Sequence, residues 1–357
     1  MDFLALFLMI LILGVLIFVH EFGHYLTAKK TGAYVYEFSL GMGPKIFSFK
    51  RKKANDPTEY SLRLFPIGGF CAIAGEVDED EPAPDDVKLK KSEYMCNKPA
   101  WQRCIILIAG VTMNFITGFI ILLISAFIWG SVSNESYIGV VPEGYPVHEA
   151  GIEVGDRILK IDGKSAKTWD KVTLLLNLKH KSDTYVFTVK KSDGSIIDYK
   201  VKPSISKNED GEEVRTFGLG QNSTRKYGIL ASIKYAFTKF FSIIGSMWSI
   251  IGNLFLGRLS LSSLSGPVGV YSIIGEAAHT SAESVLYLAA YLSINLGFIN
   301  ILPFPAFDGG RVLFLIIEAI RKKKMNPNIE NLINQIGFGI LMILMLIITI
   351  KDILRLI

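Results

Sequence analysis

Residues 3–26 read FLALFLMILILGVLIFVHEFGHYL, an apolar run that ends in a small group of polar residues. About 20 apolar residues span a bilayer as a helix, so this stretch predicts a transmembrane helix. A cleaved signal peptide is not expected, because Met1 and Asp2 supply no basic segment and His20-Glu21 stands where a small-residue cleavage site is needed. The first predicted span therefore carries ionisable residues at its end.

Three further apolar runs have membrane-spanning character. The second is residues 104–129, the third begins at Val285, and residues 336–350 form the core of the fourth. Half of the 357 residues are hydrophobic and 20% are charged, so the chain mixes membrane spans with polar domains. This composition excludes a disordered chain, and the 3 cysteines are expected to be unpaired thiols. No arginine-rich surface interleaved with aromatic residues indicates nucleic-acid binding.

Basic flanks set the predicted orientation. Lys29 and Lys30 follow the first span, and a basic run at residues 321–324 separates the third span from the fourth. By the positive-inside rule both loops are cytoplasmic, which places both termini and residues 131–284 on the external side.

The third apolar stretch, residues 285–320, is too long for one straight span. As a single helix it would extend about 54 Å, against a hydrocarbon core of about 30 Å. It is interrupted by NILPFPAFDGG at residues 300–310, where prolines and glycines break a helix. Irregular backbone at membrane depth needs a covering of protein or water, so this segment should line a site. Asp308, within it, is costly in lipid unless it has a partner.

His20, Glu21 and His24 form the pattern His-Glu-x-x-His at the cytoplasmic end of the first span. Histidines four residues apart share one helical face, so both can bind one zinc ion while Glu21 activates a water molecule. The pattern also occurs by chance, but ionisable residues within a membrane helix indicate function. The alternative is that these residues mark the end of the helix at the interface.

A catalytic zinc ion usually has three protein ligands and one open position. The other three histidines all lie in the segment predicted to be external. Asp308 lies at about the depth of His24, since each precedes a basic cytoplasmic flank. The economical ligand set is therefore His20, His24 and Asp308, although Asp308 could instead cap a helix that resumes at Val312. With Glu21 as general base, such a centre would hydrolyse peptide bonds in or at the edge of the bilayer.

Residues 33–76 contain short aromatic and β-branched runs that predict strands at 34–40, 45–49, 60–65 and 68–73. Gly68 and Gly69 would allow close backbone approach, and a strand edge there could receive an unwound substrate by β-addition, with Phe70 as a further contact. A plain turn is the alternative at these glycines. Residues 76–91 are acidic and predict a flexible linker.

The external segment looks like a PDZ domain over residues 134–204, with the signature GIEVGDRILKIDG at 151–163. PDZ domains accept extended peptides at a sheet edge. Here the domain could bind a peptide C-terminus or exclude substrates that have not been cut, and we favour exclusion. Residues 227–256 have the spacing of an amphipathic helix on the outer surface. A fifth span is the alternative, but it would place residues 321–324 outside.

These motifs, in this order on separate membrane helices, resemble the site-2 protease family of intramembrane zinc metalloproteases, in particular its bacterial regulator of sigma-E protease type. The resemblance covers nearly the whole chain and includes GVTMN at 110–114 and SGPVG at 265–269. It implies that Asp308 is the third zinc ligand. It further implies that Asn300, Pro303 and Pro305 hold substrate and that Asn114 supports the active site.

The resemblance implies a Zn²⁺-dependent protease of the bacterial plasma (inner) membrane, with its active site near the cytoplasmic face. Its expected substrates are single-pass membrane proteins such as anti-sigma factors already cut by another protease, with remnant signal peptides as a second class. Family members often carry two PDZ domains, whereas this chain has room for one. The alternatives are a catalytically silent PDZ-containing scaffold and a transporter, since broken helices with a buried aspartate also occur in transporters.

We therefore expect a polytopic α-helical membrane protein with four transmembrane helices, a membrane re-entrant β-hairpin and an extracytoplasmic α+β PDZ domain. In chain order, the expected segments are the first span (1–26), a cytoplasmic and re-entrant β-loop with a linker (27–102), the second span (103–130), the PDZ domain (131–205), an external linker with the surface helix (206–284), the interrupted third span (285–320), a basic loop (321–335) and the fourth span (336–357).

Overall fold

A computed structural model of the chain describes residues 2–50, 58–76, 89–178, 183–207, 213–257 and 265–354. The chain divides into two compact units. Unit 1 comprises Met1–Gly118 and Ser265–Asp352, and unit 2 comprises Phe119–Leu264 and Ile353–Ile357. The predicted linker at 76–91 lies almost entirely outside the described residues.

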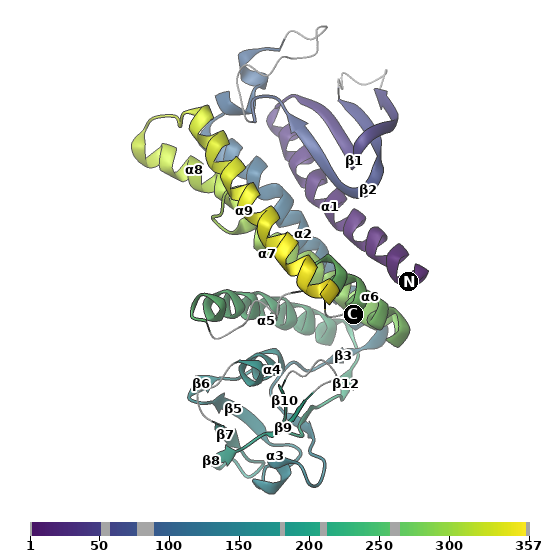
Figure 1. Cartoon of the computed structure of the whole chain (residues 1–357), viewed down its shortest axis with the longest axis vertical. Helices are drawn as coiled ribbons and strands as arrows, with labels where there is room; N and C mark the ends of the chain where they lie inside the picture. The colour runs from purple at the N-terminus through teal and green to yellow at the C-terminus, as the bar shows by residue number, and fades with distance from the viewer. Residues whose placement is uncertain are drawn as a thin grey trace. The chain divides into compact units, whose positions relative to one another are not determined.

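Unit 1 is mainly helical (Figure 1). Among the described residues, four helices are long and apolar enough to cross a membrane, which fits a polytopic membrane protein. They are α1, α2, α7 and α9. The helical elements are α1 (Phe3–Thr31), η1 (Lys91–Glu93), η2 (Met95–Asn97), α2 (Ala100–Trp129, which continues into unit 2), α6 (Pro267–Thr280), α7 (Ala282–Ile301), α8 (Asp308–Arg321) and α9 (Pro327–Leu354).

Three helix boundaries differ from the sequence-based expectation. Helix α1 continues past residue 26 to Thr31, because Lys29 and Lys30 favour a helix C-terminus and Gly32 ends it in the left-handed conformation. The break in the third stretch is present, but α8 begins at Asp308 instead of Val312. Helix α9 begins at Pro327, a residue suited to the first turn, so the basic loop is shorter than 321–335.

The predicted strands of residues 33–76 form two long, bent strands, β1 (Val35–Lys50) and β2 (Glu59–Ile73). Their register shows that each strand pairs in two halves: residues 35–40 pair with 69–73, residues 37–40 also pair with 59–62, and residues 45–50 pair with 59–63. The four predicted short strands thus correspond to halves of β1 and β2. Gly41 and Gly43, both with φ of 86°, lie at the bend in β1.

One end of this hairpin packs against the helices, and the other end is exposed. Val35, Phe38 and Ile73 are buried in a cluster with Ala28 of α1, and Figure 1 shows β1 and β2 beside that helix. The large apolar side chains Phe47 and Phe65, at the far end, are exposed. An exposed apolar surface of this kind fits contact with a membrane or a protein partner.

The SGPVG segment starts helix α6 with help from another helix. Gly266 is the N-cap of α6 and has no side chain to cap it. The buried Asp352, near the end of α9, supplies that cap: its Oδ2 atom accepts hydrogen bonds from the amides of Gly266 at 2.7 Å and Gly269 at 2.9 Å. A carboxylate distant in sequence therefore joins α9 to α6.

Unit 2 contains a four-stranded antiparallel sheet in the order β6-β5-β7-β8, with a core that includes Ile158, Phe187 and Val201. Two short strands that follow this sheet in the chain pair with strands that precede it, β11 with β4 and β12 with β3. Phe217 also lies in the core, so the compact domain extends to about Lys226, beyond the expected end at 205. The elements are β3 (Ser131–Val132), β4 (Ile138–Val140), α3 (Pro146–Glu149), β5 (Arg157–Ile161), β6 (Lys164–Ser165), α4 (Trp169–Asn177), β7 (Tyr185–Lys190), β8 (Ile196–Val201), β9 (Ser204–Lys207), β10 (Glu213–Thr216), β11 (Gly220–Gln221), β12 (Arg225–Lys226) and α5 (Ile229–Phe255).

Helix α5 is the expected amphipathic helix, and it is not one of the four candidate membrane spans. Its polar side faces α4: the Nζ atom of Lys239 lies 2.6 Å from Oδ1 of Asp170. Its aromatic side chains Phe241 and Trp248 are exposed. Figure 1 shows α4 between α5 and the sheet.

Candidate metal centre

Two elements of unit 1 bring three potential metal ligands together. Helix α1 carries His20 and His24 on one face, and α8 carries Asp308 as its first residue. The ligand atoms of all three residues lie within 4.8 Å of one another. Both histidines are less than 10% exposed, at 7% for His20 and 8% for His24. The sequence-based ligand set is therefore one spatial cluster.

The separations of these atoms fit a metal ion. The Oδ2 atom of Asp308 lies 3.1 Å from Nε2 of His20 and 3.4 Å from Nε2 of His24, and the two Nε2 atoms are 3.2 Å apart. Tetrahedral zinc with bonds of about 2.0–2.1 Å separates its ligand atoms by about 3.3–3.4 Å. Asp308 Oδ2 is buried and has no hydrogen-bond partner among the described residues. Three electron-pair donors are thus directed at one point, and one of them lacks a hydrogen-bond partner. A cation bound at that point would stabilise this arrangement.

The second nitrogen of each imidazole is held by α2. His24 donates from Nδ1 to the carbonyl oxygen of Ile106 at 2.8 Å, which leaves its Nε2 lone pair available to a metal. The Nδ1 atom of His20 lies 3.1 Å from the side-chain amide of Asn114, a fully buried residue whose Oδ1 has no partner among the described residues. Turning that amide so that Oδ1 accepts from Nδ1 satisfies Oδ1 and exposes the Nε2 lone pair of His20.

Gly110 of α2 leaves the space in which the two imidazoles meet. A Cβ atom built at this position would lie 2.7 Å from Nε2 of His20, and it would also collide with Nε2 of His24. Any larger residue would therefore displace the ligands. The sequence contains Gly110 within a recognisable motif, but only the structure shows that its missing side chain forms part of the site.

The break before Asp308 is shaped by glycines and by one strained residue. Cβ atoms at Gly309 and Gly310 would collide with the backbone of Ile301 and Phe304, respectively, so glycine lets α8 begin directly against the end of α7. Ala306 adopts a φ of 75°, which is uncommon for a residue with a side chain. Its amide donates to Oδ1 of Asn334 on α9 at 3.2 Å, a contact that holds the loop.

Glu21 lies next to strand β2. A Cβ atom built on Gly69 would come 3.6 Å from Cγ of Glu21 and 2.9 Å from the carbonyl oxygen of Ser39. The absence of a side chain at Gly69 therefore allows the strand to approach the carboxylate closely. Gly68, with a φ of 105°, takes a conformation that favours glycine.

The other predicted substrate-binding residues lie near the end of α7, in the segment before α8, and in β2. Asn300 lies in the last turn of α7 and is half-buried, Pro303 is exposed, and half-buried Pro305 lies against Gly337 of α9. The ring of Phe70 lies 4.9 Å from the guanidinium carbon of Arg63, so it packs within the hairpin. Their contacts with substrate stay a prediction.

An ion pair that the sequence analysis did not include joins the hairpin to the ligand-bearing helix. Arg311, one turn after Asp308 on α8, forms an ion pair with Glu76, which follows β2. A second ion pair, between Arg103 of α2 and Glu318, also reaches α8, at 2.8 Å. Of these two ion pairs, the one between Arg311 and Glu76 connects α8 to the strand beside Glu21. Glu76 and Arg311 are so far apart in the chain that a single sequence gives no indication that they form a pair.

Unit 1 combines apolar helices of membrane-spanning length with two histidines and an aspartate around one point, and a glutamate lies beside them. These features are typical of a membrane-embedded metal-dependent hydrolase. Comparison with known proteins agrees with this class. Residues 8–344 match the family described as Peptidase family M50. The chain therefore belongs to peptidase family M50, the site-2 protease family, and it is a zinc metalloprotease whose cofactor is Zn²⁺.

Individual relatives match over almost their full length. The chain is 32% identical over 419 residues to the regulator of sigma-W protease RasP of Bacillus subtilis, covering 97% of each protein. It is 35% identical over 345 residues to a putative zinc metalloprotease of Clostridium perfringens, covering 96% of this chain and 97% of that protein. A putative zinc metalloprotease of Fusobacterium nucleatum is 34% identical over 354 residues, covering 97% of this chain and 98% of the relative.

Proposed function

We propose that this zinc metalloprotease hydrolyses peptide bonds within transmembrane segments of single-pass proteins, with His20, His24 and Asp308 holding the zinc ion and Glu21 acting as general base. The observation that carries the proposal is the convergence of two histidine Nε2 atoms and one carboxylate oxygen within 3.4 Å, in a buried site on apolar helices. Ionisable groups are retained at membrane depth where they serve function.

The positions of these residues support the following proposed reaction. When bound, a zinc ion would lower the pKa of a water molecule and polarise the peptide carbonyl group. Glu21 takes a proton from the attacking water and delivers it to the nitrogen of the leaving amine as the C–N bond breaks. Asn114 and the carbonyl group of Ile106 keep the two imidazoles oriented through their Nδ1 atoms.

Strand β2 is the proposed binding edge for substrate. A transmembrane helix hides its peptide bonds in internal hydrogen bonds, so it must unwind before hydrolysis. The segment around Gly69 lies against Glu21, and an extended chain added to this edge would bring its backbone to the general base. Asn300, Pro303 and Pro305 are proposed to hold the substrate on the other side. The exposed apolar end of the hairpin fits a re-entrant position in the bilayer.

The proposed physiological substrates are membrane-bound anti-sigma factors cut beforehand by another protease, with remnant signal peptides as a second class. Support comes from the relative in Bacillus subtilis, which is named a regulator of sigma-W protease. Because the two proteins match over 97% of each, the same class of substrate is the simplest proposal for this chain.

Unit 2 is proposed to be a PDZ-type domain on the external side that keeps substrates with a large external part away from the site. The basic residues after α1 and before α9 support this orientation, with both termini external and the metal centre near the cytoplasmic face. A groove of about 560 Å³, lined by residues that include Val140, Trp169 and Leu176, offers a place for the alternative, capture of an extended peptide. Helix α5 is proposed to lie on the outer membrane surface.

The test is cleavage of a single-span substrate by the purified full-length protein in detergent. We expect cleavage by the unaltered protein, a loss of about 10²–10⁴-fold or more in rate with Glu21→Gln, and inhibition by a zinc chelator that added Zn²⁺ reverses. Zinc content, measured by atomic spectroscopy, should be unchanged in Glu21→Gln.

A matched control is Glu143→Gln, which makes the same chemical change at an exposed position in unit 2 and should leave cleavage unaltered. Cleavage that survives Glu21→Gln, or survives complete zinc removal, would overturn the mechanism. An unaltered protein that binds zinc but cuts no single-span substrate would favour the silent scaffold.

A further inference from the structure

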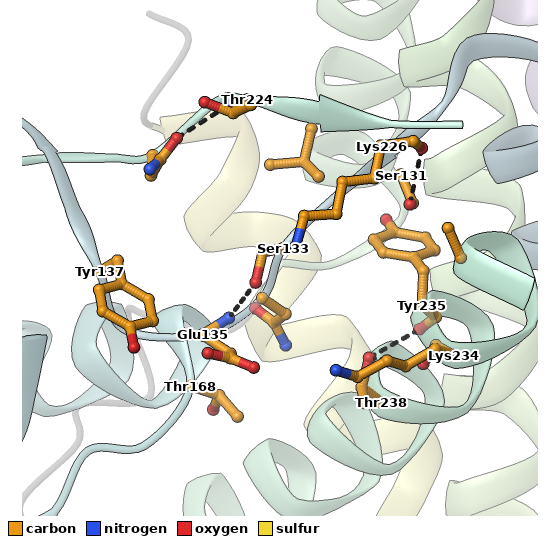
Figure 2. A pocket seen from close by; sticks show the side chains of 14 residues that line it. Ser131, Ser133, Glu135, Tyr137, Thr168, Thr224, Lys226, Lys234, Tyr235 and Thr238 are labelled. Carbon is orange, nitrogen blue, oxygen red and sulfur yellow. Dashed lines mark hydrogen bonds between the residues drawn. The ribbon is translucent and has the colours of Figure 1, made fainter. Parts of the chain in front are cut away.

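Unit 2 contains a cavity of about 340 Å³ that the proposed protease mechanism does not use (Figure 2). It is lined by β3 and β12, by the segment after β3, and by one stripe of α5. The stripe comprises Ala231, Lys234, Tyr235 and Thr238, which recur at the spacing of one helical face. Cavities of about 300 Å³ and above are large enough for a small ligand or a lipid headgroup.

The charges of this cavity favour an anion. Figure 2 shows Lys226 reaching in from β12 and Lys234 from α5. Neither ammonium group takes part in an ion pair among the residues that the structure describes. The acidic residue of the lining, Glu135, lies 3.9 Å from the guanidinium group of Arg157, which offsets its charge. Two uncompensated cations therefore face the same cavity.

The neutral part of the lining suits a phosphodiester with hydroxyl groups. Ser133, Thr168 and Tyr235 contribute hydroxyl groups to the cavity wall. Hydroxyl groups donate hydrogen bonds to phosphate oxygens and accept them from alcohols, while lysine binds phosphate as a point charge. The lining thus offers both kinds of contact that a phosphoglycerol group would make.

The surroundings of the cavity favour a ligand that also has an apolar part. Leu230, Ile233 and Phe237 of α5 occupy the helix face adjacent to the lining stripe, and all three side chains are exposed. The first lining residue in the chain, Ser131, lies two residues after Trp129, where the candidate membrane span α2 ends. A free phosphate ion would use the lysines but leave these apolar side chains without a role.

We propose that this cavity binds the headgroup of an anionic phospholipid of the outer leaflet, with the phosphate between Lys226 and Lys234 and the acyl chains along Leu230, Ile233 and Phe237. The inference rests on the part of the proposed function that places α5 on the outer membrane surface. Bound lipid would hold α5 at a fixed depth and so fix the position of the domain that α5 contacts through Asp170.

The test is native mass spectrometry of the full-length protein in a neutral detergent with short-chain phosphatidylglycerol, phosphatidylcholine or inorganic phosphate as probe. We expect one phosphatidylglycerol to bind at least tenfold more tightly than phosphatidylcholine or phosphate. The double variant Lys226→Gln/Lys234→Gln should lose this preference by about tenfold, since two charge-assisted contacts disappear. Ala231→Phe should also lose it, because the cavity is filled while both charges stay.

The matched control is Lys190→Gln/Lys200→Gln, which removes the same charge from exposed positions on β7 and β8 outside the cavity. An equal loss in both double variants would overturn the proposal in favour of general surface attraction, which lowers lipid affinity wherever a lysine is removed. Tight binding of inorganic phosphate would overturn it in favour of a free-anion site. Since the readout is lipid binding, Glu21→Gln protein serves equally well, and failure here is distinct from failure of the protease mechanism.

Discussion

Helices α1 and α5 have similar lengths, 29 and 27 residues, and both are largely apolar, but they distribute their polar residues differently. In α1 the first half exposes apolar side chains such as Phe7 and Leu11, and the ionisable residues His20, Glu21 and His24 are collected near one end. In α5 polar residues run along the whole length on one side.

The difference indicates what each environment permits. A polar side all along α5 costs little, because α4 supplies contacts such as Asp170. Two imidazoles in a membrane helix are tolerated only where neighbouring elements bury and orient them, as Ile106, Asn114 and Asp308 do. In α1 the polar residues are therefore grouped at one position along the helix, at the candidate metal centre, whereas in α5 they are grouped on one side around it.

The largest expected effect comes from filling the space beside the α1 histidines. Gly110→Val should abolish zinc binding and reduce cleavage by at least about a hundredfold, because a Cβ at this position lies 2.7 Å from Nε2 of His20. Zinc content of the purified protein, measured by atomic spectroscopy, checks this. Gly118→Ala, on the same helix as Gly110, is the control: it crowds Ile294 of α7, so it should lower stability while zinc stays bound. If both variants keep their zinc, the absence of a side chain at Gly110 is not needed for zinc binding.

A smaller effect should follow from separating the hairpin from α8. Arg311→Glu or Glu76→Arg alone should lower kcat/KM by about tenfold, because two like charges then replace the ion pair. The double exchange should restore part of that loss and return KM toward its original value. A double variant no better than either single variant would argue against this coupling.

The control for this cycle is the Arg103–Glu318 ion pair, which joins α8 to α2 instead of to the segment after β2. Exchanging its charges should change thermal stability and leave KM for the single-span substrate unaltered. An equal rise in KM there would assign the effect to the packing of α8 and not to the strand beside Glu21.

The smallest effect concerns α5. In variants that retain a single tryptophan, brominated lipid should quench the fluorescence of Trp248 several-fold more strongly than that of Trp169, because Trp248 is exposed on the aromatic side of α5. Trp169 begins α4 and lines the groove of unit 2, so it serves as the internal reference. Similar quenching of the two residues would mean that α5 does not lie on the membrane.

The candidate metal ligands are predictable from the sequence because their signals are local. His20 and His24 share a face by their spacing, and Asp308 was found from a break in an overlong apolar stretch. The role of Gly110 was not accessible, since the collision of a Cβ with two imidazoles depends on how α2 packs. The extension of the compact domain in unit 2 from residue 205 to Lys226 is not predictable, because β11 and β12 are two residues each, too short for a periodic pattern.

The space at Gly110 also bears on how related sequences should be interpreted. Every amino acid other than glycine carries a Cβ, so this position has no conservative replacement. A descendant of this protein could keep His-Glu-x-x-His and the distant aspartate intact and still lose its metal through one substitution on a different helix. Descent from an active protease to a silent one would then leave the recognised motifs unchanged, and the residue at position 110 would be the one to inspect.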